Sequence, residues 1–420
     1  MQLFKNVTFT KMFLATFASQ LGTVVGNMAF AFYLLDRFSS QPYYATLAEL
    51  MYSLPTLAVF LFVGVIADRL DRKQITVNSD WIRSGLSVLL LVAVHWNWII
   101  PAFALLFLRS AVSKFYTPAE MSLLQGIMSS EQYVQAAGLT QTITGLFMLF
   151  GMGLGSITYH YLGIECAVII DGISFVISGI LLMSCHFNPE VRQPNGKIHF
   201  RDLKFRSLMA DFGEGLLYIK NHQLLRSIIA GFLIFGVVNG VFAVLPIFTM
   251  KYKLSPDHYQ LYSSLFTIFL GIGYLIGSAF GSTLVKKFSK VTVLIAGLLL
   301  TGILTIVLNE MENIWVYLTV VSIMGAILAP VNVVLGGWLP ELVESKNMGR
   351  VSAWIEPLMM FGQSATLGVI ALAFPKLVTL DVLYLLIGIL LLVVGVFYWL
   401  VLPSLNQKYQ KEVGESVALE

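Results

Sequence analysis

Four ionisable residues interrupt long apolar stretches of the sequence: Glu49, Arg109, Asp171 and Glu356. Placing such a side chain at the centre of a bilayer costs about 2.5–3.5 kcal/mol or more, so each is a functional candidate if its stretch spans a membrane. A carboxyl group in an apolar site takes up a proton readily, and a neighbouring arginine can tune that uptake. The four residues are therefore candidates for coupling a proton gradient to another process.

Glu49 and Arg109 form the first candidate pair. Counted from the same predicted membrane face, Glu49 lies about six residues into its span and Arg109 about eight, so their depths match to within roughly 3 Å at 1.5 Å per residue. Two interpretations stay open: the pair carries out proton coupling, or it is a static ion pair that braces the helices. Asp171 and Glu356 rank behind this pair, and Glu356, beside Pro357, also suits a contact near a helix end.

A second candidate is a charged segment, GVIADRLDRK, which begins at Gly64 directly after an apolar run. Two aspartates and three basic residues lie within a stretch of six positions, 68–73, although only 12% of the whole chain is charged. The second half of the chain carries a counterpart, GSTLVKKFSK at 281–290, which keeps the glycine and the bases but has Val285 where Asp68 stands. The segment is either a solvated loop that fixes topology or a device that needs its carboxylate.

The elements that position these residues must be membrane helices. The 420 residues are 57% hydrophobic and 12% charged, with a mean hydropathy of +0.80, whereas soluble domains are about 45–50% apolar and 25% charged. Cys166 and Cys185 lie on one predicted helix, roughly 28 Å apart at 1.5 Å per residue, which is too far for a disulfide bond. The net charge of +3 is spread over short loops and offers no surface for nucleic acid.

Twelve apolar windows are long enough to span a bilayer as helices, which takes about 20 residues each. Only one connection between them is long; it begins with a Pro/Gly linker and continues as an amphipathic helical pattern. We therefore predict an all-α polytopic membrane protein with six-helix bundles at 1–186 and 225–403, a cytoplasmic linker at 187–224 and a cytoplasmic tail at 404–420. The predicted spans are 11–36, 42–67, 76–95, 101–119, 134–158, 164–186, 225–249, 259–284, 290–308, 313–335, 350–374 and 379–402.

The placement of lysine and arginine predicts the orientation of the helices. With the N-terminus inside, and with Arg83 counted in the loop after the second span, 21 of the 26 basic residues are cytoplasmic and four are outside. We expect the N-terminal stretch to be retained as the first span and both termini to be cytoplasmic. The halves also resemble each other, since Pro118 and Pro330 lie in register at an offset of 212 residues. Parallel six-helix repeats are typical of secondary transporters.

The charged segment, with glycine, three residues, Asp-Arg and then Arg-Lys, resembles motif A of the major facilitator superfamily. The resemblance covers the whole chain, and the stretches ADRLDRKQITVNSDWIRSG, FLRSAVSKFYTPA, SEQYVQAAGLTQ and DGISFVISG are similar to the macrolide-efflux branch of drug and siderophore exporters. Two departures stand out. Asp71 replaces the glycine frequent in motif A, and the pattern of arginine followed by Gln-Gly in the fourth span is reduced to Arg109 with Val112 and Ser113.

The resemblance implies a role for the charged segment. In this superfamily the end of the second span resembles a latch that faces the start of the eleventh, here near Arg350, where a carboxylate at a helix N-terminus gains about 0.3–1 kcal/mol. Such a latch favours the outward-facing state. The sixth span normally lies at the periphery of the fold, which favours a structural role for Asp171. The predicted latch residues are Gly64, Asp68, Arg69, Arg72, Lys73 and Asp80.

The resemblance also implies a substrate cavity lined by the first, fourth, seventh and tenth spans. The first span carries Thr16, Gln20, Thr23 and Asn27 at spacings of 4, 3 and 4, which places them on one polar face. The seventh span presents aromatic residues around one amide, a pattern that is also typical of lipid or helix packing. A cavity with much apolar area and few hydrogen-bonding groups suits bulky amphipathic molecules. The predicted lining residues are Gln20, Thr23, Asn27, Ser113, Tyr116, Phe232, Phe235, Asn239, Phe242 and Asn332.

Together these features predict a proton-coupled exporter of bulky amphipathic compounds such as macrolide-like drugs, working by alternating access in a bacterial-type cell membrane. Export of an endogenous siderophore or lipid is the alternative; a receptor or channel is a non-transport alternative that the latch motif and the repeats oppose. The sequence has no Walker loop, HExxH or spaced metal ligands, so we expect no enzyme activity, metal or cofactor. The expected partners are the substrate, protons and the lipid bilayer, with no nucleic acid, and we expect a monomer.

Overall fold

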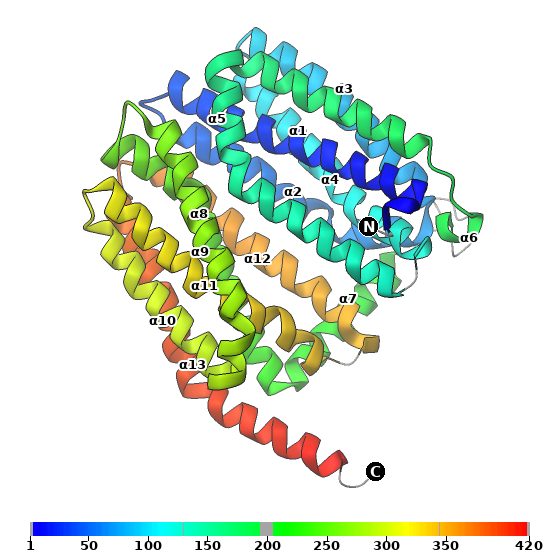
Figure 1. Cartoon of the computed structure of the whole chain (residues 1–420), viewed down its shortest axis with the longest axis vertical. Helices are drawn as coiled ribbons and strands as arrows, with labels where there is room; N and C mark the ends of the chain where they lie inside the picture. Colours follow the sequence, from blue (N-terminus) through cyan, green and yellow to red (C-terminus); the bar gives the residue numbers. More distant parts are fainter. Residues whose placement is uncertain (1–2, 129, 194–204, 344, 418–420) are drawn as a thin grey trace. The chain divides into compact units, whose positions relative to one another are not determined.

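The computed structural model describes residues 3–128, 130–193, 205–343 and 345–417, which form helices joined by short connections (Figure 1). At some helical positions, including residues 64–69 and 345–350, only the backbone is described. The helices fall into two compact units, Met1–Leu208 and Met209–Glu420. The predicted all-α fold is confirmed, and each predicted span coincides with a helix, extending past its ends by no more than three residues.

Each unit consists mainly of long helices. The chain divides into the two units between Leu208 and Met209, a point in the sequence that lies within a shorter amphipathic helix, α7 (Phe205–Asn221). The N-terminal helices are η1 (Leu3–Lys5), α1 (Val7–Arg37), α2 (Tyr43–Arg69), α3 (Arg72–His95), α4 (Ile99–Gly126), α5 (Ser130–Met183) and α6 (Pro189–Arg192). The C-terminal helices are α8 (Gln223–Thr249), the π-helical turn η3 (Met250–Leu254), α9 (Tyr259–Phe288), α10 (Lys290–Asn309), α11 (Ile314–Leu342), α12 (Ser345–Ala373) and α13 (Leu380–Val417).

Local sequence explains where several helices begin and where one bends. Asn6 caps α1, because its side-chain oxygen accepts hydrogen bonds from the backbone N–H groups of Thr8 at 3.0 Å and Phe9 at 3.2 Å. Gly163 divides α5 into two halves, since its φ of +78° belongs to the left-handed region that favours glycine. The two halves of α5 correspond to the fifth and sixth predicted spans.

In the N-terminal unit, α1 packs along both halves of α5, α3 packs on α4 and on the second half of α5, and α2 packs on α4. Glycines allow α1 to approach α5 closely. A Cβ atom at Gly22 would lie 2.1 Å from Oγ of Ser174, and one at Gly151 would lie 2.2 Å from Cγ1 of Val24. This packing brings polar side chains of α1, α3, α4 and α5 into one interior.

The C-terminal unit has the same order of contacts. There α8 packs on α12 and α13, α10 packs on α11 and α13, and α9 packs on α11. Its interior contains a chain of hydroxyl groups in which Tyr384 bonds to Thr249 at 2.8 Å and to Tyr317 at 2.7 Å. The first helix of each unit thus packs on the fifth and sixth, and the third packs on the fourth and sixth, in agreement with the similarity between the halves of the sequence.

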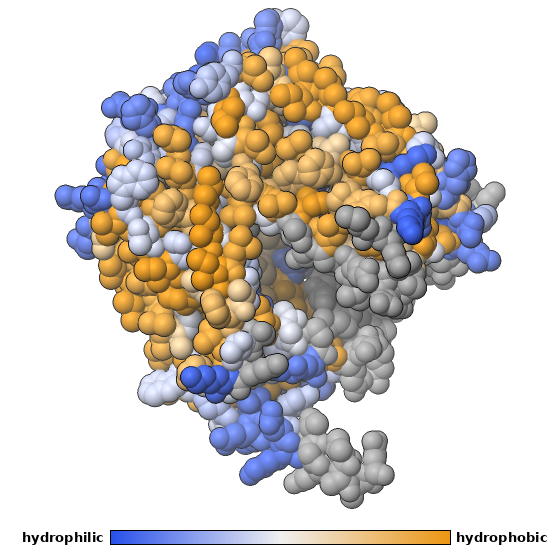
Figure 2. Space-filling view, in the orientation of Figure 1, coloured by the Kyte–Doolittle hydropathy of each residue, from blue (hydrophilic) through white to orange (hydrophobic). Residues whose placement is uncertain are grey.

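The outer faces of the helices are apolar. Ten helices within the described residues are long and apolar enough to cross a membrane. Large apolar side chains stand out from them, with Ile100 83% exposed and Leu372 91% exposed, and Figure 2 shows hydrophobic residues covering much of the visible surface. An apolar surface of this extent is unfavourable in water and favourable in lipid. The chain is therefore a multi-pass membrane protein.

Candidate functional site

Arg109 and Asp171 lie at the centre of a buried polar cluster in the N-terminal unit. The Arg109 guanidinium forms an ion pair with Oδ2 of Asp171. It also donates to Oδ1 of Asn27 at 2.9 Å and to Oγ of Ser87 at 3.4 Å. Ser87 in turn donates to Oδ2 of Asp171 at 2.9 Å. Each of the helices α1, α3, α4 and α5 supplies one member, so the cluster depends on the packing of four helices.

The predicted pairing of Glu49 with Arg109 is wrong, because Asp171 holds the guanidinium. The depth of a residue along its helix did not decide which carboxylate pairs with Arg109. Asp171 lies eight residues beyond Gly163, about as deep as Arg109 lies in its own helix, so depth allowed either carboxylate. The packing of helices decides it, since a Cβ atom at Gly26 of α1 would lie 3.1 Å from Cβ of Asp171, which shows how closely α1 and α5 enclose this site.

Glu49 is half-buried on α2 and does not join the Arg109–Asp171 pair. Tyr52, one turn further along α2, is within electrostatic range of Glu49, Arg109 and Asp171. Within the described residues, Glu49 makes no hydrogen bond or ion pair. Tyr52 therefore lies between a carboxyl group without a described partner and a buried ion pair.

A second buried ion pair lies on α3, where Asp80 and Arg83 are one turn apart. Oδ2 of Asp80 accepts a hydrogen bond from Ser178 at 2.5 Å. The Arg83 guanidinium lies 4.2 Å from the ring centroid of Phe175 and 5.1 Å from that of Tyr116. The assignment of Arg83 to a cytoplasmic loop is wrong: α3 begins well before this residue, and the side chain, 5% exposed, is buried by the rings around it.

Glu120 is a buried carboxyl group that the sequence analysis missed. The hydroxyl of Thr16 on α1 donates to Oε1 of Glu120, and Gln20 lines a cavity beside it. The surrounding sequence, TPAEMSLLQG, reads as a semi-polar link, whereas α4 continues to Gly126. One signal locates Glu120: it follows Arg109 by 11 residues, about three helical turns, so both lie on the same face of α4.

The charged segment GVIADRLDRK holds the region that follows α5. Asp71 caps α3 by accepting the backbone N–H groups of Lys73 at 3.0 Å and Gln74 at 3.2 Å, and it forms an ion pair with Arg192. Nζ of Lys73 donates to the carbonyl oxygens at the end of α5, those of Met183 and Cys185, each at 2.8 Å. Glycine, the residue frequent at this motif position, has no side chain to make either bond of Asp71.

The predicted latch residues are only partly described. For Gly64, Asp68 and Arg69 the structure describes only the backbone, so the latch role of Asp68 stays a prediction. Arg72 donates to the carbonyl oxygen of Val191 at 3.4 Å. Among the described residues, the Asp80 carboxylate accepts hydrogen bonds from Arg83 and Ser178.

The predicted cavity residues of the N-terminal unit lie in different surroundings. Asn27 reaches Arg109 and Gln20 reaches the cavity at Glu120, so the polar face of α1 serves both carboxyl-containing clusters. Of the remaining three residues, two donate hydrogen bonds to carbonyl groups of their own helix and one is buried. Thr23 donates to the carbonyl of Ser19 at 2.8 Å, Ser113 donates to that of Ser110 at 2.7 Å, and Tyr116 is buried beside Arg83.

The predicted residues of the C-terminal unit do not form a polar cluster within that unit. Phe232 is buried on α8, and its ring contacts Phe235 edge-on at 5.8 Å between centroids. Phe242 is half-buried, and Asn239 is exposed. On α11, Asn332 is exposed and donates to the carbonyl of Leu328 at 3.2 Å, and Glu356 is exposed on α12.

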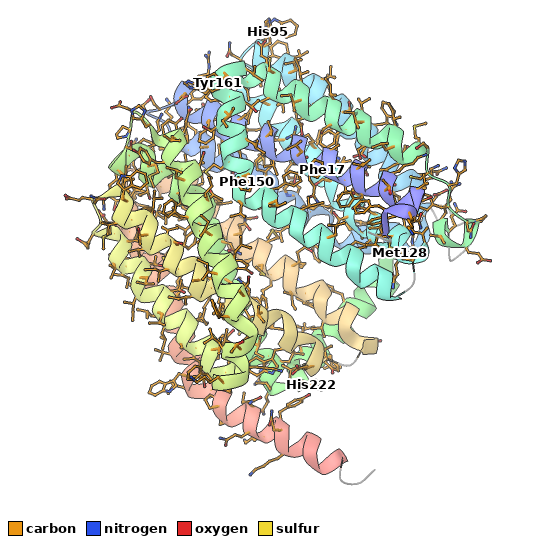
Figure 3. The ribbon with its side chains drawn as sticks, viewed as in Figure 1. Phe17, His95, Met128, Phe150, Tyr161 and His222 are labelled. Carbon is orange, nitrogen blue, oxygen red and sulfur yellow. The ribbon has the colours of Figure 1, made fainter. Side chains whose placement is uncertain are left out.

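Different charged groups lie at the two ends of the N-terminal unit. The charged segment lies at the start of α3, and His95, the last residue of α3, lies at the other end, near Tyr161 (Figure 3). There the Nδ1 atom of His95 lies 2.9 Å from Oε1 of Glu165, just after the bend in α5. The Arg109–Asp171 cluster lies between these ends.

The cluster leaves one buried acceptor without a described hydrogen bond. One oxygen of Asp171, Oδ1, is buried and has no hydrogen-bond partner among the described residues. Buried acceptors of this kind are uncommon. Within the described residues, no group of three His, Cys, Asp or Glu side chains could hold a metal ion.

The sequence matches a known family along most of its length. A family model described as the Major Facilitator Superfamily matches residues 12–272 and 252–419. The uncharacterized MFS-type transporter YkuC of Bacillus subtilis (strain 168) is 51% identical over 405 residues, which cover 96% of this chain and 94% of that protein.

Two more distant likenesses concern an efflux protein and a solved structure. Macrolide efflux protein A of Streptococcus pyogenes is 24% identical over 399 residues, which cover 93% of each chain. The crystal structure of a bacterial homologue of the iron transporter ferroportin matches with a TM-score of 0.72 at 14% identity, over 93% of this chain and 97% of that chain. The second likeness concerns the fold alone.

Proposed function

The chain belongs to the major facilitator superfamily, and on that premise we propose that it exports bulky amphipathic compounds of macrolide-like character in exchange for protons. It is a transporter of the bacterial cell membrane with many spanning helices. The observation that carries the proposal is the likeness to macrolide efflux protein A along 93% of both chains. The sequence lacks a Walker loop, so a proton gradient is the energy source that we propose.

The buried ion pair of Arg109 and Asp171 supports proton coupling. The Arg109 guanidinium and the Asp171 carboxylate balance each other's charge, and a buried charge that loses its partner is strongly unfavourable. A proton arriving at the cluster therefore favours a rearrangement of the helices that hold Arg109. Glu49, one turn from Tyr52 on α2 and without a partner among the described residues, is the proposed proton carrier.

Uptake of erythromycin into inverted membrane vesicles tests the proposal. With an imposed gradient, acidic inside, the wild type takes up the macrolide and the rate falls when the gradient is collapsed. Glu49→Gln loses the response to the gradient but keeps exchange in its absence, because it cannot release a proton. Glu312→Gln, which changes an exposed glutamate in a loop, is the matched control.

Each alternative outcome is informative. Uptake that ignores the gradient contradicts proton coupling. Loss of coupling in Glu356→Gln but not in Glu49→Gln moves the carrier to α12. Failure to take up any of a panel of amphipathic compounds contradicts the proposed exporter.

A further inference from the structure

One side of the linker helix α7 is exposed and apolar. The part of α7 that begins at Met209 belongs to the C-terminal unit, and its side chains are described from Phe212 onwards. Leu216 is 47% exposed and Leu217 is 57% exposed. Lys220, which is also exposed, follows these leucines by four and three positions, so the three side chains share one side of the helix. Together they form the leucine side of α7.

Two other sides of α7 contact the rest of the unit. The ring of Phe212 stacks on that of Trp354 from α12 at 3.9 Å between centroids, and the indole N–H of Trp354 donates to the carbonyl oxygen of Phe212 at 2.9 Å. Ile219 is buried, and Tyr218 lies within electrostatic range of Tyr409 on α13. The helices α12 and α13 therefore hold α7 in place and leave its leucine side exposed.

The connection to α8 places α7 at the level of the lipid headgroups. Only His222 separates α7 from α8, which begins at Gln223 and has 27 residues. A helix of this length extends about 40 Å, whereas the hydrocarbon core is about 30 Å thick, so α8 begins in the headgroup layer. His222 lies at the end of the unit from which α13 extends (Figure 3). The leucine side of α7 therefore lies beside the surface of the bilayer.

The described charges at this end of the unit favour an anionic surface. Glu341, at the end of α11, is paired with Lys290, and Glu214 lies on another side of α7 from Lys220. Basic groups near a membrane surface are attracted to anionic lipids, and exposed leucines gain free energy when they leave water for acyl chains. The exposed bases at this end are Lys220 on α7, Arg226 in the first turn of α8, and Lys408 and Lys411 in the extension of α13.

We propose that the leucine side of α7 binds an anionic phospholipid, such as phosphatidylglycerol, at the membrane surface. The two leucines contact acyl chains just below the headgroups, and Lys220 pairs with the lipid phosphate. This contact fixes one side of the linker helix to the membrane, while Trp354 fixes another side to α12. The inference concerns the membrane partner of α7 and does not depend on which compound the protein transports.

Quenching of a fluorescent label by spin-labelled lipids tests the contact. In a background of Cys166→Ser and Cys185→Ser, a bimane label is attached at Leu216→Cys, and the protein is reconstituted with lipids that carry a doxyl group just below the headgroup. We expect strong quenching, because the label enters the lipid. Glu214→Cys is the matched control, since this position lies about 160° around the helix from Leu216 at 3.6 residues per turn. Its label should be quenched by iodide in the water instead.

Two quenching lipids test the recognition of the headgroup. Doxyl-labelled phosphatidylglycerol should quench the label at Leu216→Cys at an about fivefold lower mole fraction than doxyl-labelled phosphatidylcholine, as one lysine near an anionic surface implies. Lys220→Gln should remove most of this preference and leave quenching by the phosphatidylcholine probe unchanged. If Leu216→Cys does not fold, as judged by thermal unfolding, Leu217→Cys provides the same measurement on the same side of the helix.

Each of the other results overturns the inference. Equal quenching by the two lipids shows that the leucine side is an apolar anchor without headgroup recognition. Quenching by iodide rather than by lipid shows that this side faces water. Quenching by neither shows that protein covers it: the cover is a second copy of the chain if it is lost as the protein-to-lipid ratio falls, and another part of the same chain if it is not.

Discussion

The guanidinium of Arg109 on α4 and the carboxylate of Asp171 on α5 form a buried ion pair, braced by Ser87 and Asn27. Both side chains are almost fully buried, with 6% and 0% of their surface exposed. An ion pair in this position links four helices of the N-terminal unit. The pair is therefore a structural element whether or not it also takes part in proton coupling.

Asp171→Asn tests the strength of this pair. We expect the substitution to lower the free energy of unfolding by about 3–5 kcal/mol, because it leaves a buried guanidinium without its counter-charge. The double variant Arg109→Met with Asp171→Leu should lose less than the sum of the single changes, as measured by thermal unfolding in detergent. Glu49→Gln is the control and should change stability by less than about 0.5 kcal/mol; an equal loss in both would show that Glu49 holds Arg109.

The two aspartates of the charged segment should differ in what they do. Asp71→Ala removes the cap of α3 and the ion pair with Arg192, so we expect a loss of about 1–2 kcal/mol in unfolding free energy. Asp68→Asn should abolish export while leaving expression and unfolding unchanged, as the latch prediction requires. The measurements are thermal unfolding and vesicle uptake. Normal uptake by Asp68→Asn would remove the latch hypothesis.

Gly22 tests the close approach of α1 to α5. A Cβ atom at Gly22 would lie 2.1 Å from Oγ and 2.5 Å from Cβ of Ser174, so Gly22→Ala should force the helices apart and destabilise the protein by about 1–3 kcal/mol. Gly85→Ala is the matched control, since nothing lies within 4 Å of its Cβ position on α3. It should be neutral or stabilising, because alanine favours a helix more than glycine does. Equal unfolding temperatures for the two variants would contradict the packing of α1 on α5.

The hydrogen-bonded hydroxyl groups of Thr249, Tyr384 and Tyr317 in the C-terminal unit allow a further prediction. Tyr384→Phe removes the group that bonds both Thr249 and Tyr317 in the buried interior, and two buried hydroxyls then lose a partner. We expect a loss of about 1–3 kcal/mol in unfolding free energy. Tyr274→Phe changes an exposed tyrosine on α9 and should have no measurable effect. A neutral Tyr384→Phe would mean that the hydroxyl chain does not contribute to stability.

Cysteine labelling tests the orientation of the helices. Cys166 is exposed near the bend of α5, and Cys185 is buried just after its end. Burial raises the pKa of the Cys185 thiol. Since the thiolate is the reactive form, Cys185 should react slowly at pH 7 and faster as the pH rises. With both termini cytoplasmic, an impermeant maleimide should label Cys166 in intact cells and Cys185 only after permeabilisation.

Single-cysteine variants provide the control for this experiment. Cys166→Ser should abolish labelling of intact cells, and Cys185→Ser should leave it unchanged. Labelling of Cys166 only in inverted vesicles would reverse the predicted topology.

The sequence by itself determined the helices and the family. A span requires a long apolar stretch, and such a stretch is visible in composition alone; for this reason each predicted span coincides with a helix. The break between the fifth and sixth spans, 134–158 and 164–186, and the charged segment before α3 were also visible, because interruptions of an apolar stretch and clustered charges are local features. The presence of ionisable residues at Glu49, Arg109 and Asp171 was equally clear.

The tertiary structure decided which of these residues meet. Depth along a helix follows from residue number, but the direction in which a side chain points, and which neighbour it faces, depends on how helices pack. The glycines at Gly22 and Gly26 bring α1 against α5, and Asp171 rather than Glu49 faces Arg109 as a result. The same packing buries Arg83 and encloses Glu120, two charged residues whose surroundings are built from three or more helices and are therefore absent from any single stretch of sequence.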